Sequence, residues 1–357
     1  MNTVHAQKKS CLLIVLLFLM AGINGRAEIF DSTKKKELSE TFSASSGDKV
    51  KLDNRYGNIT VAHWNNPEVN IRVVIEAKGG SEKRAQELLD RVQISLNKAG
   101  GTISGITSLG NQSWNGDNAK LIINYYVNMP SGLALSISQK YGNINLPERN
   151  EGKTDLEVKY GNIKAGSFTL PLTVEAGYSN VNLGDVQDCS LDLAYCGNVS
   201  FNNGKDIKID NKYSNLKIRN IASLKLDNKY GNIAIQNVDK ISMDVKYSEV
   251  SIERIKDELI VFSLDYSTLK VGELASTFKK AEVSARYGNF NVSISPNASF
   301  RVSAERMKYG NVDVKGFNIT NSTVEDKVNH HYQINSGGNN IIRFNGNNYS
   351  NIRVRAL

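Results

Sequence analysis

A tyrosine followed by glycine or serine, and usually by asparagine, recurs at nearly constant spacing along this chain. From Tyr141 to Tyr309 the tyrosines of successive motifs stand 17 to 22 residues apart, and an earlier copy begins at Tyr56. So short and regular a period is typical of proteins that stack one small unit on the next, and not of a compact domain. The tyrosines predicted to line one corner of such a stack are Tyr56, Tyr141, Tyr160, Tyr178, Tyr213, Tyr230, Tyr247, Tyr287 and Tyr309.

Each repeat is predicted to form a short strand on either side of the motif. In residues 224–235, LKLDNKYGNIAI, apolar residues stand at alternate positions, which indicates strands with one buried face. The column four residues before the tyrosine is apolar and includes Phe262, so Phe262 is expected to point inward. The tyrosine stands an even number of positions after these inward residues and is therefore expected on the same side of the strand. The corner is expected at the Gly-Asn pair, because both residues adopt unusual backbone angles.

The fold class that follows is an all-β solenoid with about 17–22 residues per coil. Coils stacked at the usual strand spacing, about 4.8 Å, place like residues above like. The tyrosines then stack, and the asparagines form a ladder in which each amide donates to the next. Corner packing explains both columns, and a binding role is the alternative. The predicted ladder consists of Asn143, Asn162, Asn180, Asn215 and Asn232.

Residues 1–27 have the pattern of a signal peptide, because Lys8 and Lys9 precede an apolar run at residues 11–21 and small residues follow. Cleavage is expected after Ala27, with Gly25 as the alternative, and no later segment is long and apolar enough to span a membrane. We expect an exported protein in the periplasm, at the outer membrane or outside the cell. The expected divisions are residues 28–130 for N-terminal strands, the first repeat and a cap or insertion with a helix starting at Ser81, 131–317 for the repeats, and 318–357 for closing strands.

The cysteines beyond the predicted signal are expected to be unpaired. Cys189 occupies an inward apolar column, and seven residues of strand separate it from Cys196 by more than a disulfide can bridge. The sequence Tyr195-Cys-Gly-Asn has one residue more than the other motifs, which indicates either a bulge or Cys196 in place of the tyrosine.

A column of basic residues directly precedes the tyrosines. It could form a cationic stripe that holds an anionic polymer such as an acidic polysaccharide or lipopolysaccharide. Acidic residues two positions earlier face the same side and could neutralise the stripe. The formal net charge of +8 is mild for 357 residues, and no nucleic-acid partner is expected. The lysines of this stripe are Lys159, Lys212, Lys229 and Lys246.

No motif of a catalytic, phosphate-binding or calcium-binding site is present in the sequence. His330 and His331 are adjacent, but a metal site needs three or four ligands at matched spacing. We therefore expect no enzyme, no cofactor and no metal.

Two segments carry a family resemblance: residues 40–64, ETFSASSGDKVKLDNRYGNITVAHW, and 121–146, LIINYYVNMPSGLALSISQKYGNINL. They resemble the bacterial putative adhesin family, a domain of unknown function in cell-envelope proteins of Bacteroidota. The resemblance implies a right-handed β-solenoid, export and a role in adhesion, with no catalytic residues to carry over. We expect a non-enzymatic, adhesin-like or scaffolding protein. The alternatives are a β-helix protein that binds or cleaves polysaccharide, and an envelope signalling partner that docks another protein.

Overall fold

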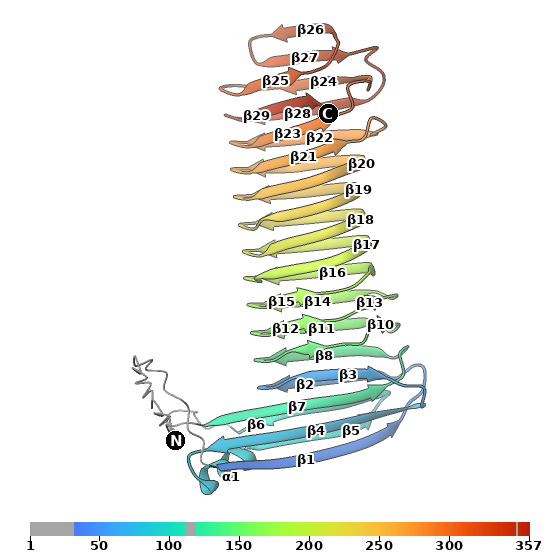
Figure 1. The fold of residues 1–357 in the computed structure, drawn as a ribbon, viewed down its shortest axis with the longest axis vertical. Helices are drawn as coiled ribbons and strands as arrows, with labels where there is room; N and C mark the ends of the chain where they lie inside the picture. The colour runs from blue at the N-terminus through green and yellow to red at the C-terminus, as the bar shows by residue number, and fades with distance from the viewer. Residues whose placement is uncertain (1–31, 111–118, 348) are drawn as a thin grey trace, which may run out of the picture.

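The structure, a computed structural model, describes residues 32–110, 119–347 and 349–357. In these residues one helix accompanies a single extended sheet in which most neighbouring strands run parallel. Figure 1 shows the strands lying one above another in a tall stack, with the helix at its lower end. The predicted all-β fold is therefore confirmed, and the predicted signal peptide lies outside the described residues.

The elements fall into three groups along the chain. The first group is β1 (Ser32–Ser43), β2 (Lys49–Arg55), β3 (Ile59–His63), β4 (Glu68–Gly79), α1 (Glu82–Asp90), β5 (Val92–Ala99), β6 (Thr102–Leu109) and β7 (Lys120–Met129). The second is β8 (Ala134–Lys140), β9 (Ile144–Asn145), β10 (Arg149–Asn150), β11 (Thr154–Lys159), β12 (Asn162–Lys164), β13 (Ser167–Phe168), β14 (Leu172–Gly177), β15 (Asn180–Asn182), β16 (Val186–Ala194), β17 (Asn198–Lys212), β18 (Asn215–Lys229), β19 (Ile233–Lys246) and β20 (Glu249–Asp265). The third is β21 (Thr268–Leu274), β22 (Lys280–Arg286), β23 (Asn289–Ile294), β24 (Phe300–Glu305), β25 (Asn311–Lys315), β26 (Ile319–Glu325), β27 (Asn329–Ile334), β28 (Ile341–Asn347) and β29 (Asn351–Ala356).

Strands of successive repeats pair in parallel, with like residues side by side. Ile209 pairs with Leu226, and Leu226 pairs with Met243. Ile218 and Ile235 pair in the same way on the other side of the tyrosine. All five side chains are at most 2% exposed, so the alternate apolar residues form one continuous core along the stack.

The expectation that Gly-Asn supplies the unusual backbone angle at the corner is wrong. Every motif tyrosine has a φ angle between 49° and 64°, whereas none of the glycines directly after them has a positive φ. The glycines serve close packing instead: a Cβ on Gly142 would lie 1.6 Å from the carbonyl oxygen of Gly57, and one on Gly161 would lie 1.9 Å from that of Gly142. The left-handed conformation also turns the tyrosine rings away from the core, where their parity had placed them.

Phe262 departs from the inward column. β20 has a register irregularity against both neighbours, where Val261 pairs with Met243 but Leu264 pairs with Val245. The inward position is filled by Val261, and Phe262 is 60% exposed. The expectation that Phe262 lies in the core is wrong, because a β-bulge reverses the alternation and column alignment alone does not reveal it.

The N-terminal end is covered by antiparallel strands. β4 lies between β1 and β7, and β5 pairs with β6. Helix α1 contacts β4 and β1, and it starts as predicted at Ser81, whose Oγ accepts a hydrogen bond from the Arg84 N–H at 3.2 Å. The first repeat, β2 and β3, lies between this cap and β8 and β9, so the cap closes the open end of the core.

At the C-terminal end the order along the stack differs from the order in the sequence. β28 lies between β22 and β24, and β29 lies between β23 and β25. The last coil of the chain is thus inserted between two coils that precede it in sequence, and the antiparallel hairpin β26–β27 lies beyond them. The near-constant period had implied that Tyr287 and Tyr309 are neighbours in the stack. They are not, because Tyr349 stacks between them.

Candidate functional site: a tyrosine ridge

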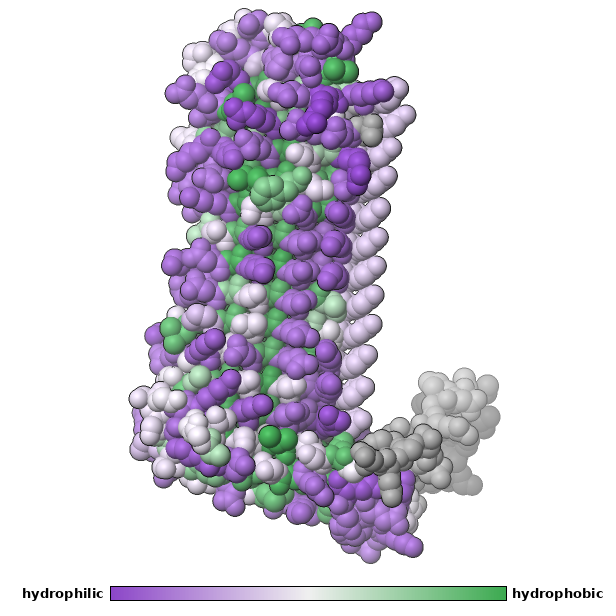
Figure 2. Space-filling model, turned by 180° about the vertical axis from the view of Figure 1, so that it is seen from behind, coloured by the Kyte–Doolittle hydropathy of each residue, from purple (hydrophilic) through white to green (hydrophobic). Residues whose placement is uncertain are grey.

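All tyrosines of the chain except Tyr125, Tyr126 and Tyr332 lie in a single column, which we call the tyrosine ridge. Neighbouring rings have centroids 4.7–5.7 Å apart and planes within 20° of parallel. Figure 2 shows the resulting row of protruding side chains along one edge of the stack. In their order along the stack the members are Tyr56, Tyr141, Tyr160, Tyr178, Tyr195, Tyr213, Tyr230, Tyr247, Tyr266, Tyr287, Tyr349 and Tyr309.

The ridge is an exposed surface and not a buried corner. From Tyr141 onward each tyrosine is 39–65% exposed. Each ring covers a face of its neighbour, so the parts left to solvent are ring edges and phenolic hydroxyls. Such a surface offers one hydrogen-bonding group per coil, repeated at the spacing of the strands.

Tyrosine at these corners is unfavourable for the backbone conformation. The left-handed conformation costs a residue with a side chain about 1–2 kcal/mol, and asparagine adopts it more readily. Contact between two aromatic rings stabilises the fold by only about 0.5–1.5 kcal/mol beyond the contribution of the area that they bury. Because the turn itself needs no tyrosine, the same backbone strain at every corner points to a use for the exposed rings.

The predicted asparagines run beside the ridge. The Asn162 side-chain amide donates to Asn143 Oδ1, and that of Asn180 donates to Asn162 Oδ1, each at 2.8 Å. Farther along, the backbone N–H of Asn232 donates to Asn215 Oδ1 at 3.2 Å. These hydrogen bonds fix the amides in register with the tyrosines.

A second ladder, which the sequence reading did not single out, lies where the strands bend seven or eight residues after each tyrosine. The amides of Asn203, Asn220 and Asn237 donate in turn to Asp185, Asn203 and Asn220 at 2.7–2.8 Å. The sequence could have revealed this ladder, because its asparagines recur at the same distance after successive tyrosines.

A buried polar column two residues before the tyrosine was also missed. Asn211 and Asn228 are fully buried, and the Asn211 amide donates to Asn228 Oδ1 at 2.6 Å and to the Ser214 carbonyl at 2.9 Å. The Gln139 amide likewise donates to the Gly57 carbonyl at 2.6 Å. These amides satisfy backbone carbonyls at the corner, and their inward parity could have identified them.

The lysines of the predicted stripe lie beside carboxylates. Lys159 Nζ is 3.4 Å from Glu157 and 3.5 Å from Glu175, and these carboxylates raise the pKa of the Lys159 ammonium. The remaining pairs are Lys212 with Asp210 and Lys229 with Asp227, both at 3.7 Å, and Lys246 with Asp265 at 4.0 Å.

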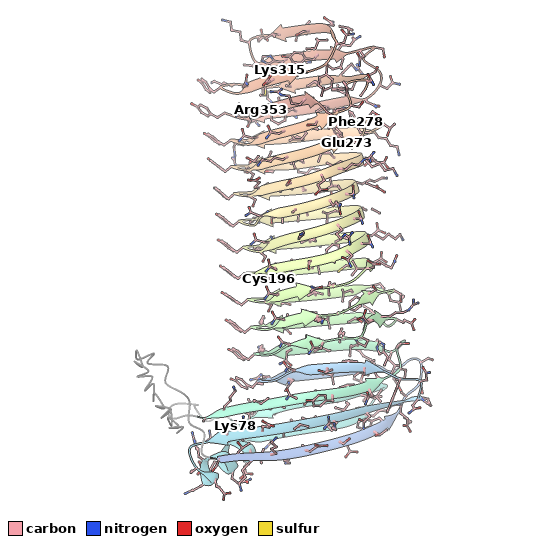
Figure 3. The ribbon with its side chains drawn as sticks, viewed as in Figure 1. Lys78, Cys196, Glu273, Phe278, Lys315 and Arg353 are labelled. Atoms are coloured by element: carbon pink, nitrogen blue, oxygen red, sulfur yellow. The ribbon has the colours of Figure 1, made fainter. Side chains whose placement is uncertain are left out.

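Cys189 and Cys196 are free and buried. Tyr195 keeps its place in the ridge, Cys196 follows it as glycine or serine does elsewhere, and Gly197 is the extra residue. Figure 3 shows Cys196 near the ridge edge of the stack. Its Sγ lies 3.3 Å from the Ala176 carbonyl oxygen, so the thiol takes part in the corner packing.

Both thiols are expected to resist alkylation in the folded protein. Burial raises the pKa of Cys189 to about 12 and also raises that of Cys196, so at pH 8 neither forms the reactive thiolate. Iodoacetamide at pH 8, followed by mass spectrometry of the two peptides, should give labelling only after denaturation. Rapid labelling of either peptide in the native protein would contradict this burial.

No group of three or more His, Cys, Asp or Glu within the described ranges could hold a metal ion. Burial, and secondarily the neighbouring His331, lower the pKa of His330. Of the part of the chain that the structure describes, no helix is long and apolar enough to cross a bilayer.

No family model matches the sequence, and no curated protein matches it. A comparison with solved structures finds several matches at low sequence identity. A putative adhesin from Parabacteroides distasonis shares 10% identity at a TM-score of 0.33, covering 90% of this chain and 97% of its own. A putative cell adhesion protein from Clostridium sporogenes shares 13% identity at a TM-score of 0.17, covering 91% of this chain and 100% of its own.

A third solved structure, a putative lipid binding protein from Parabacteroides distasonis, shares 12% identity at a TM-score of 0.29, covering 72% of this chain and 92% of its own. Identities and TM-scores this low transfer no function to the chain.

Proposed function

We propose that this chain is an exported, non-enzymatic, right-handed β-solenoid with about 17–22 residues per coil, which acts as an adhesin-like protein of the cell envelope. Pairing of residues 17 positions apart, as in Asn211 and Asn228, supports the coil length. Export rests on the basic and apolar pattern of residues 1–27. The observation that carries the function is the tyrosine ridge, an exposed row of identical groups along the stack.

The partner that suits this ridge is a linear glycan lying along the stack axis. Ring faces are covered by neighbouring rings, so flat stacking of a ligand on the tyrosines is excluded except at the two ends. The exposed hydroxyls and the adjacent amide ladder instead offer hydrogen bonds that repeat once per coil. A polymer that repeats along its own length makes many weak contacts with such a row at once, and their sum gives useful affinity.

The lysine stripe is expected to contribute little to this binding. Each of the four lysines has a carboxylate within 4.0 Å, so the field that would attract an acidic polymer is largely cancelled. Exposed pairs of this kind are usually worth about 0–1 kcal/mol, and salt screens them further.

Replacing Tyr213, Tyr230 and Tyr247 together by asparagine tests the proposal. Asparagine tolerates the left-handed conformation, so the corners should keep their shape while the exposed rings disappear. We expect retention on immobilised linear glycans, one neutral β-glucan and one acidic polyuronate, to fall about 10-fold for the glycan that the wild-type protein binds, equivalent to roughly 1.4 kcal/mol.

The matched control replaces Lys212, Lys229 and Lys246, the residues directly before these tyrosines, by glutamine. Its retention should change less than about twofold. Unchanged retention of the tyrosine variant would reject the ridge as the contact surface. A loss confined to the lysine variant and the acidic glycan would identify the cationic stripe as the contact surface instead.

A further inference from the structure

A cavity of about 440 Å³ lies at the edge of the stack opposite the ridge, near the N-terminal cap. Three turns line it, residues 44–46, 64–67 and 130–133, which directly follow β1, β3 and β7. In Figure 1 the ends of these strands meet at the lower right, whereas the corners that carry the ridge tyrosines, such as the one between β2 and β3, lie along the other edge. Turns that follow three different strands therefore form one site, which shares no residue with the tyrosine ridge, the asparagine ladders or the lysine stripe.

Backbone hydrogen bonds join the three turns to one another. The Ala44 N–H donates to the Pro67 carbonyl at 2.8 Å, and the Trp64 N–H donates to the Met129 carbonyl at 3.1 Å. The indole Nε1–H donates to the Glu68 carbonyl at 2.8 Å. The half-buried Trp64 is thus held in place with its polar edge already satisfied, and its remaining surface is apolar.

The lining of the cavity is uncharged throughout, although 22% of the residues in the chain are charged. Hydroxyls come from Ser45, Ser46 and Ser131, and side-chain amides come from Asn65 and Asn66. The Ser131 hydroxyl donates to Glu151 at 2.7 Å, so it keeps only acceptor capacity. An aromatic ring with neutral hydroxyl and amide groups around it suits a ligand that has an apolar face and several hydroxyls.

We propose that this cavity binds one unit of a neutral sugar, with an apolar face of the sugar ring on the Trp64 indole and its hydroxyls on Asn65, Asn66 and Ser45. The uncharged lining disfavours an acidic sugar, which would bring a carboxylate with no cation to meet it. The site is separate from the tyrosine ridge, so sugar binding in the cavity can be tested independently of the proposed function.

The test titrates the protein with small neutral sugars, namely glucose, galactose, mannose and N-acetylglucosamine, and with glucuronate, by isothermal calorimetry and ligand-observed NMR. These ligands span at most one or two coils and cannot use the length of the ridge. We expect at least one neutral sugar to bind with a Kd of about 1 mM, the affinity usual for so small a ligand, and glucuronate to bind at least 10-fold more weakly.

Trp64→Ala should weaken this binding at least 10-fold, and Asn65→Ala should weaken it severalfold without removing the aromatic ring. The matched control is Phe262→Ala, which deletes another accessible aromatic side chain far from the cavity, and it should bind as the wild type does. The triple tyrosine-to-asparagine variant should also be unaffected, which separates this site from the ridge. Absence of binding by every neutral sugar at 50 mM, equal binding by Trp64→Ala, or preference for glucuronate would each overturn the proposal.

Discussion

Removal of residues 339–357 is expected to unfold the coil of β24 and β25 and the hairpin beyond it, while the repeats below stay folded. The deleted segment contains β28 and β29, which are the only parallel partners of β24 and β25 among the described strands. Four of its side chains are at most 1% exposed, and burying such side chains is worth about 1.5–3 kcal/mol each, roughly 6–12 kcal/mol together as an upper estimate. The four are Ile342, Phe344, Ile352 and Val354.

Limited proteolysis read by mass spectrometry checks this expectation. Cleavage should appear within residues 300–334 of the truncated chain, whereas residues 134–274 should stay protected, because their strands pair with one another. A synthetic peptide of residues 339–357 should restore protection when added in excess, and a scrambled peptide should not. Full protection of residues 300–334 without the peptide would show that β24 and β25 pair directly with β22 and β23.

Gly142→Ala is expected to cost about 3–5 kcal/mol of unfolding free energy. Its Cβ would fall 1.6 Å from the Gly57 carbonyl oxygen, and both atoms belong to backbones fixed by strand pairing on either side. The two coils must therefore separate locally, which places the substitution among the most damaging single changes. Urea unfolding of the purified variant measures the loss.

Gly47→Ala is the matched control for this substitution. Gly47 has no heavy atom within 4 Å of its added Cβ and no positive φ, so the change should be neutral or slightly stabilising. Equal urea midpoints for the two variants would show that the close approach between coils is not what requires glycine at position 142.

Much of the architecture could be predicted from the sequence, because residues one period apart are in contact in a stacked repeat. The residues that alternate around each tyrosine are the ones that pair between coils, as Ile209, Leu226 and Met243 do. The N-cap at Ser81 was equally readable, because capping depends on neighbours within one turn. Local chemistry and a repeated contact need no knowledge of distant segments.

The errors arose where a single backbone state or a distant segment decides the outcome. The alternation pattern could not show that Tyr141 and its equivalents, and not the glycines, take the left-handed angle, so the ridge was expected at a packed corner. Phe262 points outward because one extra residue in β20 reverses the parity. The buried amides of Asn211 and Asn228 were missed, because no polar column was sought at inward positions.

The candidate sites divide in the same way. The recurrence of tyrosines, asparagines and lysines in columns follows from the sequence alone, because a period of about 18 residues fixes which side chains become neighbours in a stack. It took the folded chain to show that the rings face solvent, that Tyr349 stacks between Tyr287 and Tyr309, and that the turn containing Trp64 lines one cavity with two other turns. Those outcomes depend on backbone angles and on contacts between segments far apart in the chain, which a repeating pattern does not encode.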